Sequence, residues 1–389
     1  MGNILHSPRI KSALVFAYLA LFPLGQLPRF FMELVGLTAV HFTDVVVLVL
    51  LGLTFFPVRR GMYRSYLVTL VVLTGFSFLV PGIFSLRSVL YAVRLAAYIH
   101  LGFVVYDLAR AKSTQRLILQ SLVLVSVVSA VVGIGQYMFA SDLRTLKTIG
   151  WDDHYFRLVG TLLDPAFTGI LLVLGTLLTI VRREQLFGKH ILLHRFVIGT
   201  LGLALLLTYS RASFLALFCA LLALAIKHRY ARVGIFMLVV GIALLPQSLP
   251  SEGVKLTRSA SVIQKYENAF VAREVIASSP LFGVGMDLCR AKEDLLGIDR
   301  SEHLHDCSGL ENSVLFAFAA WGIAGVGALL GILVPLTRIG LKDTYVRSMI
   351  VAVFVHMQFT NTLFYPWVMG WIVLSCGIVA RELTEKKSL

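Results

Sequence analysis

The sequence predicts an all-α protein, a polytopic bundle of transmembrane helices. The chain has 389 residues, of which 58% are hydrophobic and only 14% are charged, whereas soluble domains carry about 25% charged residues. Apolar runs recur along its whole length, many of them close to the roughly 20 residues that cross a hydrocarbon core about 30 Å thick. One membrane bundle therefore explains the composition better than two or three soluble domains.

The apolar runs divide the chain into twelve expected spans and one long polar segment. The first run has no small-residue cleavage site and is followed by Pro28 and Arg29, so it is expected to be a span and not a signal peptide. The expected spans are residues 12–27, 34–56, 65–80, 86–107, 117–139, 161–181, 191–208, 212–226, 231–246, 312–336, 346–363 and 366–381. The chain then has three regions, which are spans one to nine (1–246), a partly helical outward loop (247–311), and spans ten to twelve with a tail (312–389).

Basic residues are divided unequally between the two sets of loops. Of the 35 Lys and Arg residues, 21 fall on one side and are spread over every short loop, while 13 fall on the other, seven of them in 251–310. Because short cytoplasmic loops collect Lys and Arg, both termini are expected in the cytoplasm and 251–310 on the outer, periplasmic face. The same rule accounts for the net charge of +14, which therefore indicates a membrane protein and not a nucleic-acid-binding one.

Four ionisable residues fall inside expected spans. They are His41 and Asp44 in the second span and Arg94 and His100 in the fourth. Ionisable groups within a bilayer are costly and usually face a polar interior. Asp44 and Arg94 are candidates for an ion pair, and the two histidines are expected to pack near the interface.

Two outward connections carry candidate site residues. The seventh and eighth spans share about 36 residues and meet at Thr208–Ser213 (TYSRAS), which places Arg211 at or below the outer interface. Non-helical backbone at that depth is tolerated only where it lines a cavity or packs within protein. The alternative is that Arg211 is an ordinary interfacial Arg that reaches lipid headgroups. The loop 141–160 contributes His154 and Arg157 among aromatic residues, and Pro165 after it is expected to break or kink the start of span six.

The long loop mixes basic and acidic residues, so most of its charges are expected to be solvated. Residues 254–278 have the pattern of an amphipathic helix that lies on the bilayer or the bundle. Because Arg binds phosphate oxygens bidentately and stays charged, Arg211 together with Arg258 or Arg273 is predicted to clamp a pyrophosphate. The following turn, Ser279–Gly285 (SPLFGVG), offers close backbone approach through its glycines.

A carboxylate stands at the head of span ten. Glu311 and Asn312 are followed by nine residues and then by Gly322, Gly325 and Gly327. Partial burial would suit Glu311 to act as a general base. The alternative is that Glu311 merely favours the helix dipole and that the glycines permit close helix packing.

Cysteine and metal chemistry contribute little to the expected function. Cys219 and Cys376 lie in apolar runs and are expected to be inert, while Cys289 and Cys307 share the outward loop and are hypothesised to form a disulfide. The segment His303–Cys307 (HLHDC) has no recognised ligand spacing, so neither a metal nor another cofactor is expected.

Three stretches and their order resemble the bacterial O-antigen polymerase and O-antigen ligase superfamily. They are Leu207–Ser213 (LTYSRAS), Ser279–Gly285 and the spacing from Asn312 to Gly325, and a large outward loop lies between spans nine and ten. The resemblance covers roughly residues 200–330. It implies a GT-C-like glycosyltransferase that acts on polyprenyl-pyrophosphate-linked saccharides, with Arg211 and Arg258 or Arg273 on the pyrophosphate.

This chain departs from the ligases at one position. Ligases carry His-Asn where Glu311-Asn312 stands here, and that His is considered their base. Either Glu311 supplies the base, or the chain belongs to a polymerase branch without the ligase His. His303 and His305 are near but out of register, and with Asn312, Arg157 and His154 they form the predicted supporting set.

The expected function is a repeat-unit polymerase of O-antigen or another surface polysaccharide in the bacterial inner membrane. It would transfer glycan from undecaprenyl or another polyprenyl pyrophosphate to an acceptor sugar hydroxyl, with inversion and without metal. One alternative is a ligase that transfers the glycan to lipid A-core in lipopolysaccharide biosynthesis, and another is a flippase or transporter for lipid-linked glycan. An ATP-driven pump is disfavoured because the sequence has no P-loop. Expected partners are the lipid-linked oligosaccharide, the acceptor glycan or lipid A-core, membrane lipids and a chain-length regulator.

Overall fold

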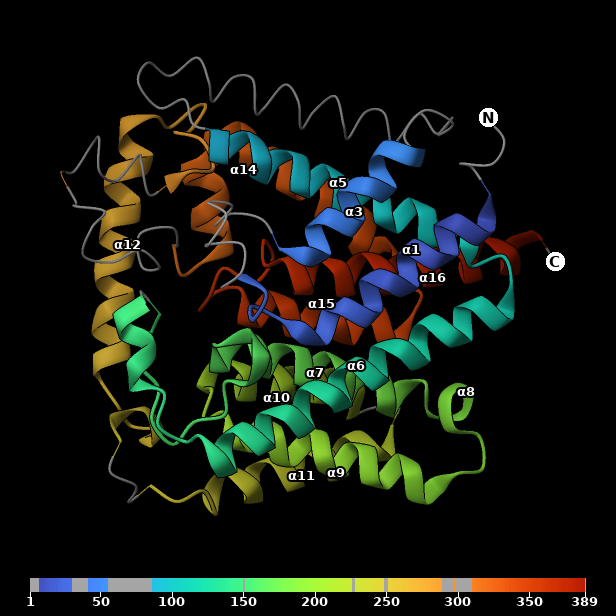
Figure 1. Ribbon diagram of the computed structural model, residues 1–389, viewed down its shortest axis with the longest axis horizontal. Helices are drawn as coiled ribbons and strands as arrows, with labels where there is room; N and C mark the ends of the chain where they lie inside the picture. The colour runs from blue at the N-terminus through green and yellow to red at the C-terminus, as the bar shows by residue number, and fades with distance from the viewer. Residues whose placement is uncertain are drawn as a thin grey trace.

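The structure is a computed structural model. It describes residues 7–29, 41–54, 86–149, 151–225, 228–247, 251–288, 297 and 310–388. Within these ranges all regular elements are helices (Figure 1), and the only β pairing is an isolated bridge between Asp142 and Tyr155. The all-α prediction is therefore confirmed for the described part of the chain.

The helices follow the predicted apolar runs closely. They are α1 (Pro8–Leu21), α3 (Phe42–Thr54), α5 (Leu86–Leu108), α6 (Lys112–Phe139), α7 (Pro165–Val181), α8 (Arg183–Phe187), α9 (Ile191–Leu207), α10 (Arg211–Ala225), α11 (Arg229–Ala243), α12 (Ala260–Ser278), α14 (Ser313–Gly340), α15 (Thr344–His356) and α16 (Pro366–Ser388). Short 3-10 turns add η1 (Phe22–Leu24), η2 (Arg144–Ile149), η3 (Gly160–Leu162) and η4 (Glu252–Val254). Every predicted span overlaps a helix except 65–80, which lies outside the described residues.

Few of the described helices meet the length and composition of a membrane span. Among the residues that the structure describes, three helices are long and apolar enough to cross a membrane, Ser88–Leu108, Lys112–Phe139 and Pro366–Lys386. The halves of α14, which are bent by 59°, add a fourth if they form one span. The other apolar helices have 13 to 17 residues and rise only about 20–25 Å. The twelve-span count is therefore not confirmed.

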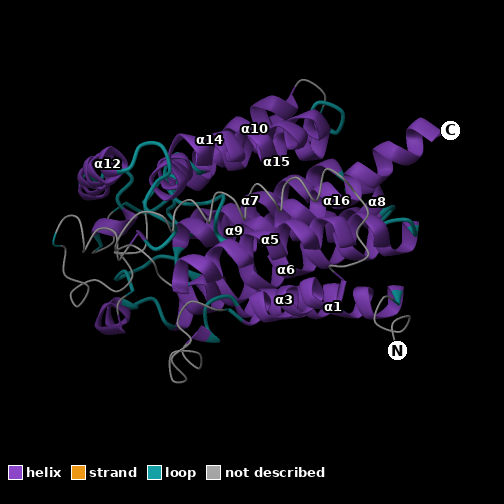
Figure 2. Ribbon diagram, turned by 90° about the horizontal axis from the view of Figure 1, so that it is seen from above, coloured by secondary structure: helices purple, strands orange, loops and turns teal. Residues whose placement is uncertain are grey.

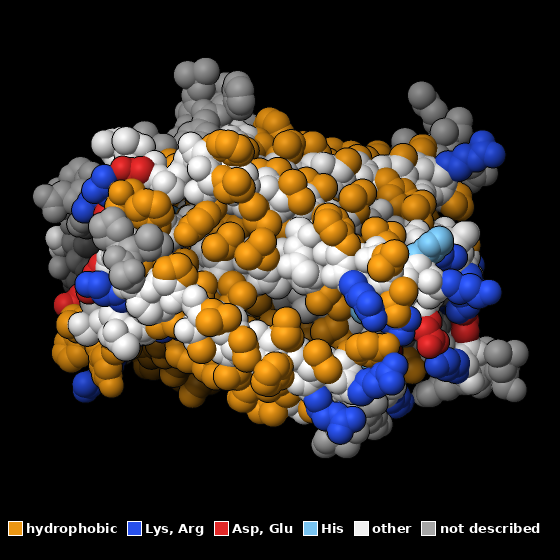
Figure 3. All heavy atoms as spheres, turned by 90° about the horizontal axis from the view of Figure 1, so that it is seen from below, with side chains coloured by type: hydrophobic (Ala, Val, Ile, Leu, Met, Phe, Trp, Pro, Cys, Tyr) orange, Lys and Arg blue, Asp and Glu red, His pale blue; other side chains and the backbone are white. Residues whose placement is uncertain are grey.

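Most helices lie side by side, and α12 stands across one end of them (Figures 1 and 2). At the opposite end, ion pairs join the loops that carry most of the basic residues. Arg182 lies 2.8 Å from Asp343 and 3.0 Å from Glu382, and Lys112 lies 2.7 Å from Glu385. Hydrophobic side chains cover the middle of the face seen in Figure 3, and charged ones gather towards its two ends. This distribution fits a membrane protein.

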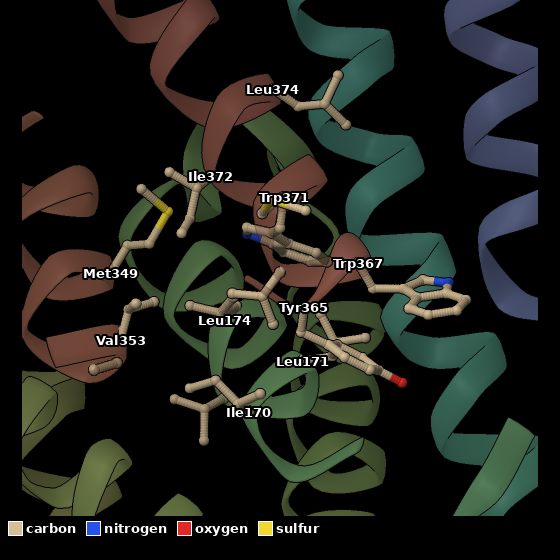
Figure 4. Close-up of a cluster of buried hydrophobic side chains, with 14 of the residues drawn as sticks. Ile170, Leu171, Leu174, Met349, Val353, Tyr365, Trp367, Trp371, Ile372 and Leu374 are labelled. Carbon is tan, nitrogen blue, oxygen red and sulfur yellow. The ribbon is translucent and has the colours of Figure 1, made fainter. Parts of the chain in front are cut away.

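The centre of the bundle is α7. All its residues from Thr168 to Ile180 are buried, as expected for a helix that is hydrophobic all round. It packs against α6, α9, α10 and α15, and side chains of α7, α15 and α16 meet in one apolar cluster (Figure 4). Within it the Trp371 indole N–H donates to the Tyr345 hydroxyl at 2.8 Å. The rigid core holds the start of α7 in place, where the site residues lie.

The ionisable residues inside the bundle have partners. Arg94 on α5 lies 2.6 Å from the Asp44 carboxylate on α3, so these two candidates do form an ion pair. His100 and Thr54 share a hydrogen bond of 2.5 Å, and the His41 ring packs 4.8 Å from that of Trp367. Of the cysteines, Cys219 and Cys376 are free thiols, whereas Cys289 and Cys307 lie outside the described residues.

Candidate functional site

The candidate site lies at the end of the bundle that α12 covers. Here the loop before α7, the connection between α9 and α10, the segment around η4, and the start of α14 come together. A backbone hydrogen bond from Leu158 N to Leu207 O (2.9 Å) joins the first two of these segments, and Arg211 joins the second to the segment around η4. At the start of α14, Ser313 N donates to Met357 O at the end of α15 (3.0 Å). Segments that lie far apart in the sequence therefore meet at this end of the bundle.

Two of the predicted phosphate-binding arginines interlock. The Arg211 guanidinium, at the start of α10, donates to the carbonyl oxygens of Leu256 and Arg258, both at 3.1 Å. Arg258 in turn donates to the Gly253 carbonyl at 2.7 Å and reaches back to the Tyr209 carbonyl at 3.5 Å. Of the two arginines predicted as partners of Arg211, Arg258 is therefore the one that meets it, and the pair fixes the segment around η4 against the α9–α10 turn.

Arg157 is the third arginine of the cluster. Its Nε donates to the Thr208 carbonyl at 3.1 Å, and its side chain packs on Gly253. Burial and the neighbouring charge of Arg258 lower the pKa of Arg157 to about 9. Burial and Arg211 lower the pKa of Arg258 to about 10. Because the three cations disfavour one another, an anion placed among them would be stabilised.

The lowered arginine pKa values predict how anion binding depends on pH. Both groups are protonated at neutral pH, and a bound anion would return each pKa towards its usual value. Affinity for sulfate, which does not titrate in this range, is therefore expected to be constant from about pH 7 to 8. Above about pH 9 it should fall by up to about tenfold per pH unit for each proton lost. Calorimetric titration with sulfate measures this, and an affinity that stays constant up to about pH 11 would contradict the arrangement.

Asp164 is a site residue that the sequence did not single out. It caps α7, because its Oδ1 accepts hydrogen bonds from the backbone N–H groups of Ala166 (2.6 Å) and Phe167 (2.8 Å). Pro165 occupies the first helical position, so the span predicted from residue 161 begins four residues later, with the expected break before it. Burial raises the pKa of Asp164, while the Phe167 N–H and the charges of Arg157 and Lys265 oppose that shift. A carboxylate therefore lies beside the cations. The Asp-Pro pair could have indicated a helix cap at this position from the sequence.

The predicted base is held by a lysine from α12. Lys265 Nζ hydrogen-bonds and ion-pairs with Glu311, and it also donates to the Phe359 carbonyl at 2.5 Å. Asn312 caps α14 by accepting from the Val314 N–H at 2.8 Å. Lys265 therefore holds Glu311 just before the start of α14. The sequence pattern did not indicate this partner, because Lys265 is one of many charged residues in its loop.

Other predicted residues are placed differently. Arg273 is exposed on α12, two turns and about 12 Å along the helix from Lys265, and it has no part in the arginine cluster. His154 is only 6% exposed, and its Nε2 has no hydrogen-bond partner within the described ranges. Burial, Arg157 and Arg258 lower the pKa of His154 to about 3, so its imidazole is neutral and weakly basic. His303 and His305 lie outside the described residues.

The SPLFGVG turn and the glycines of α14 form a backbone clasp next to the site. Val284 N and Gly285 N donate to the carbonyls of Ala319 and Ala320, both at 2.9 Å. In return Ile323 N donates to the Pro280 carbonyl at 2.9 Å. This exchange requires α14 to break at Gly322, where φ is +63°. The expected close backbone approach is confirmed, and it joins the end of α12 to α14.

The comparisons with known proteins give no match. No model of a known protein family matches this chain, and no curated protein matches it either. In the part of the chain that the structure describes, no three His, Cys, Asp or Glu side chains gather where they could hold a metal ion. The chemistry of the site therefore has to be inferred from the arginine cluster, Lys265, Asp164 and Glu311.

Proposed function

We propose that this protein is a membrane glycosyltransferase that uses a polyprenyl-pyrophosphate-linked saccharide as donor. Within that class, we propose a repeat-unit polymerase of O-antigen or another surface polysaccharide. The observation that carries the proposal is the meeting of Arg157, Arg211 and Arg258, from three separate segments, at one end of an apolar helical bundle. A pyrophosphate on a lipid chain is an anion that arrives at the end of such a bundle. The resemblance of the three sequence stretches supports the same class.

The arrangement suggests how the transfer would proceed. The bond between the anomeric carbon and the pyrophosphate oxygen breaks as an acceptor hydroxyl oxygen attacks the same carbon from the opposite face, so the configuration inverts. The arginines stabilise the charge on the departing lipid pyrophosphate, and Lys265 adds a further positive charge. Glu311 takes the proton of the attacking hydroxyl. The donor is already activated, so the step needs no nucleotide.

One incubation separates this function from its two alternatives. Purified protein in lipid bilayers is given a polyprenyl-pyrophosphate oligosaccharide, and the products are separated by size. The polymerase yields longer glycans and free lipid pyrophosphate. Transfer only when lipid A-core is supplied indicates the ligase, and translocation across the bilayer without a new bond indicates a flippase.

Glu311→Gln tests the proposed base. The substitution keeps the size of the side chain and removes its basicity, so turnover is expected to fall by about 100-fold or more while the protein remains folded. Glu267→Gln is the matched control, because Glu267 is exposed on α12 and should leave turnover unchanged. Initial rates of transfer are measured for both variants. Wild-type turnover in Glu311→Gln would remove Glu311 as the base.

A further inference from the structure

A polar cavity lies beside the arginine cluster, within the same end of the bundle. Its volume is about 290 Å³, close to the lower end of the range for small-molecule sites, roughly 300 Å³. Residues near η1, α5, the loop before α7 and the segment between α15 and α16 form its walls. Asp164 belongs to both features, since it lines the cavity and also lies in the field of Arg157 and Lys265.

Two residues that line this cavity carry buried amide oxygens. Gln26 is only 5% exposed, and its Nε2 donates to the Tyr365 hydroxyl at 3.3 Å. Its Oε1, and the Oδ1 of Asn361, have no hydrogen-bond donor among the described residues. A buried acceptor without a donor is unfavourable. Both residues line the cavity, but the two oxygens themselves are covered by protein, so a ligand with several hydroxyl groups would satisfy them once the amide groups turn towards it.

The other walls suit a sugar ring. Aromatic side chains line the cavity, and arginines lie over two of them, Arg29 at 5.3 Å from the Trp151 ring centre and Arg94 at 5.0 Å from that of Tyr91. Flat rings can pack against the C–H faces of a sugar, while Asp164, the amides and the arginines can bond its hydroxyls. A simple anion would use only the arginines.

An apolar groove opens next to the cavity. It has a volume of about 500 Å³, runs between α5, α14 and α16, and shares Leu95, Phe364 and Met369 with the polar cavity. A ligand that fills both spaces has a polar head and an apolar chain. This pair of spaces is separate from the arginine cluster, where the proposed donor pyrophosphate would lie.

We propose that the cavity is the binding site for the acceptor, a saccharide carried on a lipid chain, with its sugar between Gln26 and Asn361 and its chain in the groove. This inference rests on the proposed function. The acceptor hydroxyl would leave the cavity near Asp164, the residue that the cavity and the arginine cluster share. Glu311 would take its proton there, because Lys265 ion-pairs with Glu311 and its charge also acts on Asp164. A polymerase needs such a second site, because its acceptor is also lipid-linked.

Binding of alkyl glycosides tests this site without any transfer reaction. The protein is reconstituted in lipid nanodiscs and titrated with decyl glycosides of glucose, galactose, mannose and N-acetylglucosamine, with decyl tetraethylene glycol as the probe without a sugar. At least one glycoside is expected to bind at least about tenfold more tightly than the sugar-free probe, and sulfate should not displace it. Equal binding of all probes, or displacement by sulfate, would overturn the proposal.

Substitutions locate the bound sugar. Gln26→Leu and Asn361→Leu are each expected to weaken glycoside binding by about three- to tenfold, the value of one neutral hydrogen bond, and not to change binding of the sugar-free probe. Gln185→Leu on α8, at the other end of the bundle, is the control. Unchanged glycoside binding in both single variants, each checked for folding by its thermal transition, would contradict the site. Glycoside binding without transfer activity would overturn the proposed function alone, and transfer without glycoside binding would overturn the acceptor site alone.

Discussion

Arg211→Ala is expected to reduce glycan transfer by at least about 100-fold, the effect of losing one group that stabilises developing charge in an active site. Arg211 comes from the α9–α10 turn and donates to the Leu256 and Arg258 carbonyls. The substitution therefore removes one cation of the cluster and also loosens the segment that carries another. Initial rates at saturating donor, measured together with the thermal transition of each variant, separate loss of chemistry from loss of folding.

Arg273→Ala is the matched control for this result. Arg273 also belongs to the long polar segment, but it is exposed on α12 and outside the cluster. Its removal should change the rate by less than about twofold, as expected for a surface substitution away from a site. Arg211→Lys should restore folding but only part of the rate, because a lysine cannot bind two phosphate oxygens in the fork geometry. Equal losses in Arg211→Ala and Arg273→Ala would contradict the assignment.

Gly283→Ala is expected to destabilise the protein by about 3 kcal/mol or more. Gly283 has a φ of +70°, which L side chains rarely adopt. A methyl group there would also overlap the peptide between Ala320 and Trp321. Because that peptide belongs to the backbone, relief requires the clasp between the SPLFGVG turn and α14 to open. Thermal unfolding in nanodiscs should show a clearly lower transition temperature than the wild type.

Gly135→Ala provides the comparison for the clasp. It is cleaner than a substitution on α14 itself, because Gly327 ends the first half of that bent helix. Gly135 lies within α6, has no positive φ, and has open space around the position of an added methyl group. Since Ala favours helix more than Gly does, this variant should be as stable as the wild type or slightly more stable. A wild-type transition temperature for Gly283→Ala would show that the clasp is not essential to the fold.

The helices could be predicted from the sequence because burial in a membrane leaves long apolar runs. The sequence also offered Asp44 and Arg94 as a candidate pair, since an ionisable residue within a span usually faces a polar interior, and the structure places the two groups 2.6 Å apart. The number of spans was not predictable in the same way. An apolar run marks a helix that avoids water, and α7 shows that such a helix can be buried by its neighbours throughout.

The site was predicted in part, and the missing part has a physical reason. Glycine and arginine motifs are local, so short stretches predicted a close backbone approach at the SPLFGVG turn and a meeting of Arg211 with Arg258 or Arg273. The choice between Arg258 and Arg273 depended on which side of α12, and of the segment that leads into it, faces the bundle. Only the tertiary packing decides that orientation. Lys265 was one of several similar charges in its loop, and its role appears only from its contact with Glu311. Asp164 had a helix-capping signal, but its closeness to Arg157 depends on tertiary structure.

The most direct test of the proposed function compares the number of glycosidic bonds formed with the number of lipid pyrophosphates released. Purified protein in bilayers is incubated with a polyprenyl-pyrophosphate oligosaccharide labelled in both the sugar and the lipid, and both products are quantified over time. A transferase of the proposed kind forms one new glycosidic bond for each lipid pyrophosphate released, with inverted configuration at the anomeric carbon, and both products are expected to fall together in Arg211→Ala. Lipid-linked oligosaccharide that crosses the bilayer intact, with no bond formed and no pyrophosphate released, would contradict the proposed function.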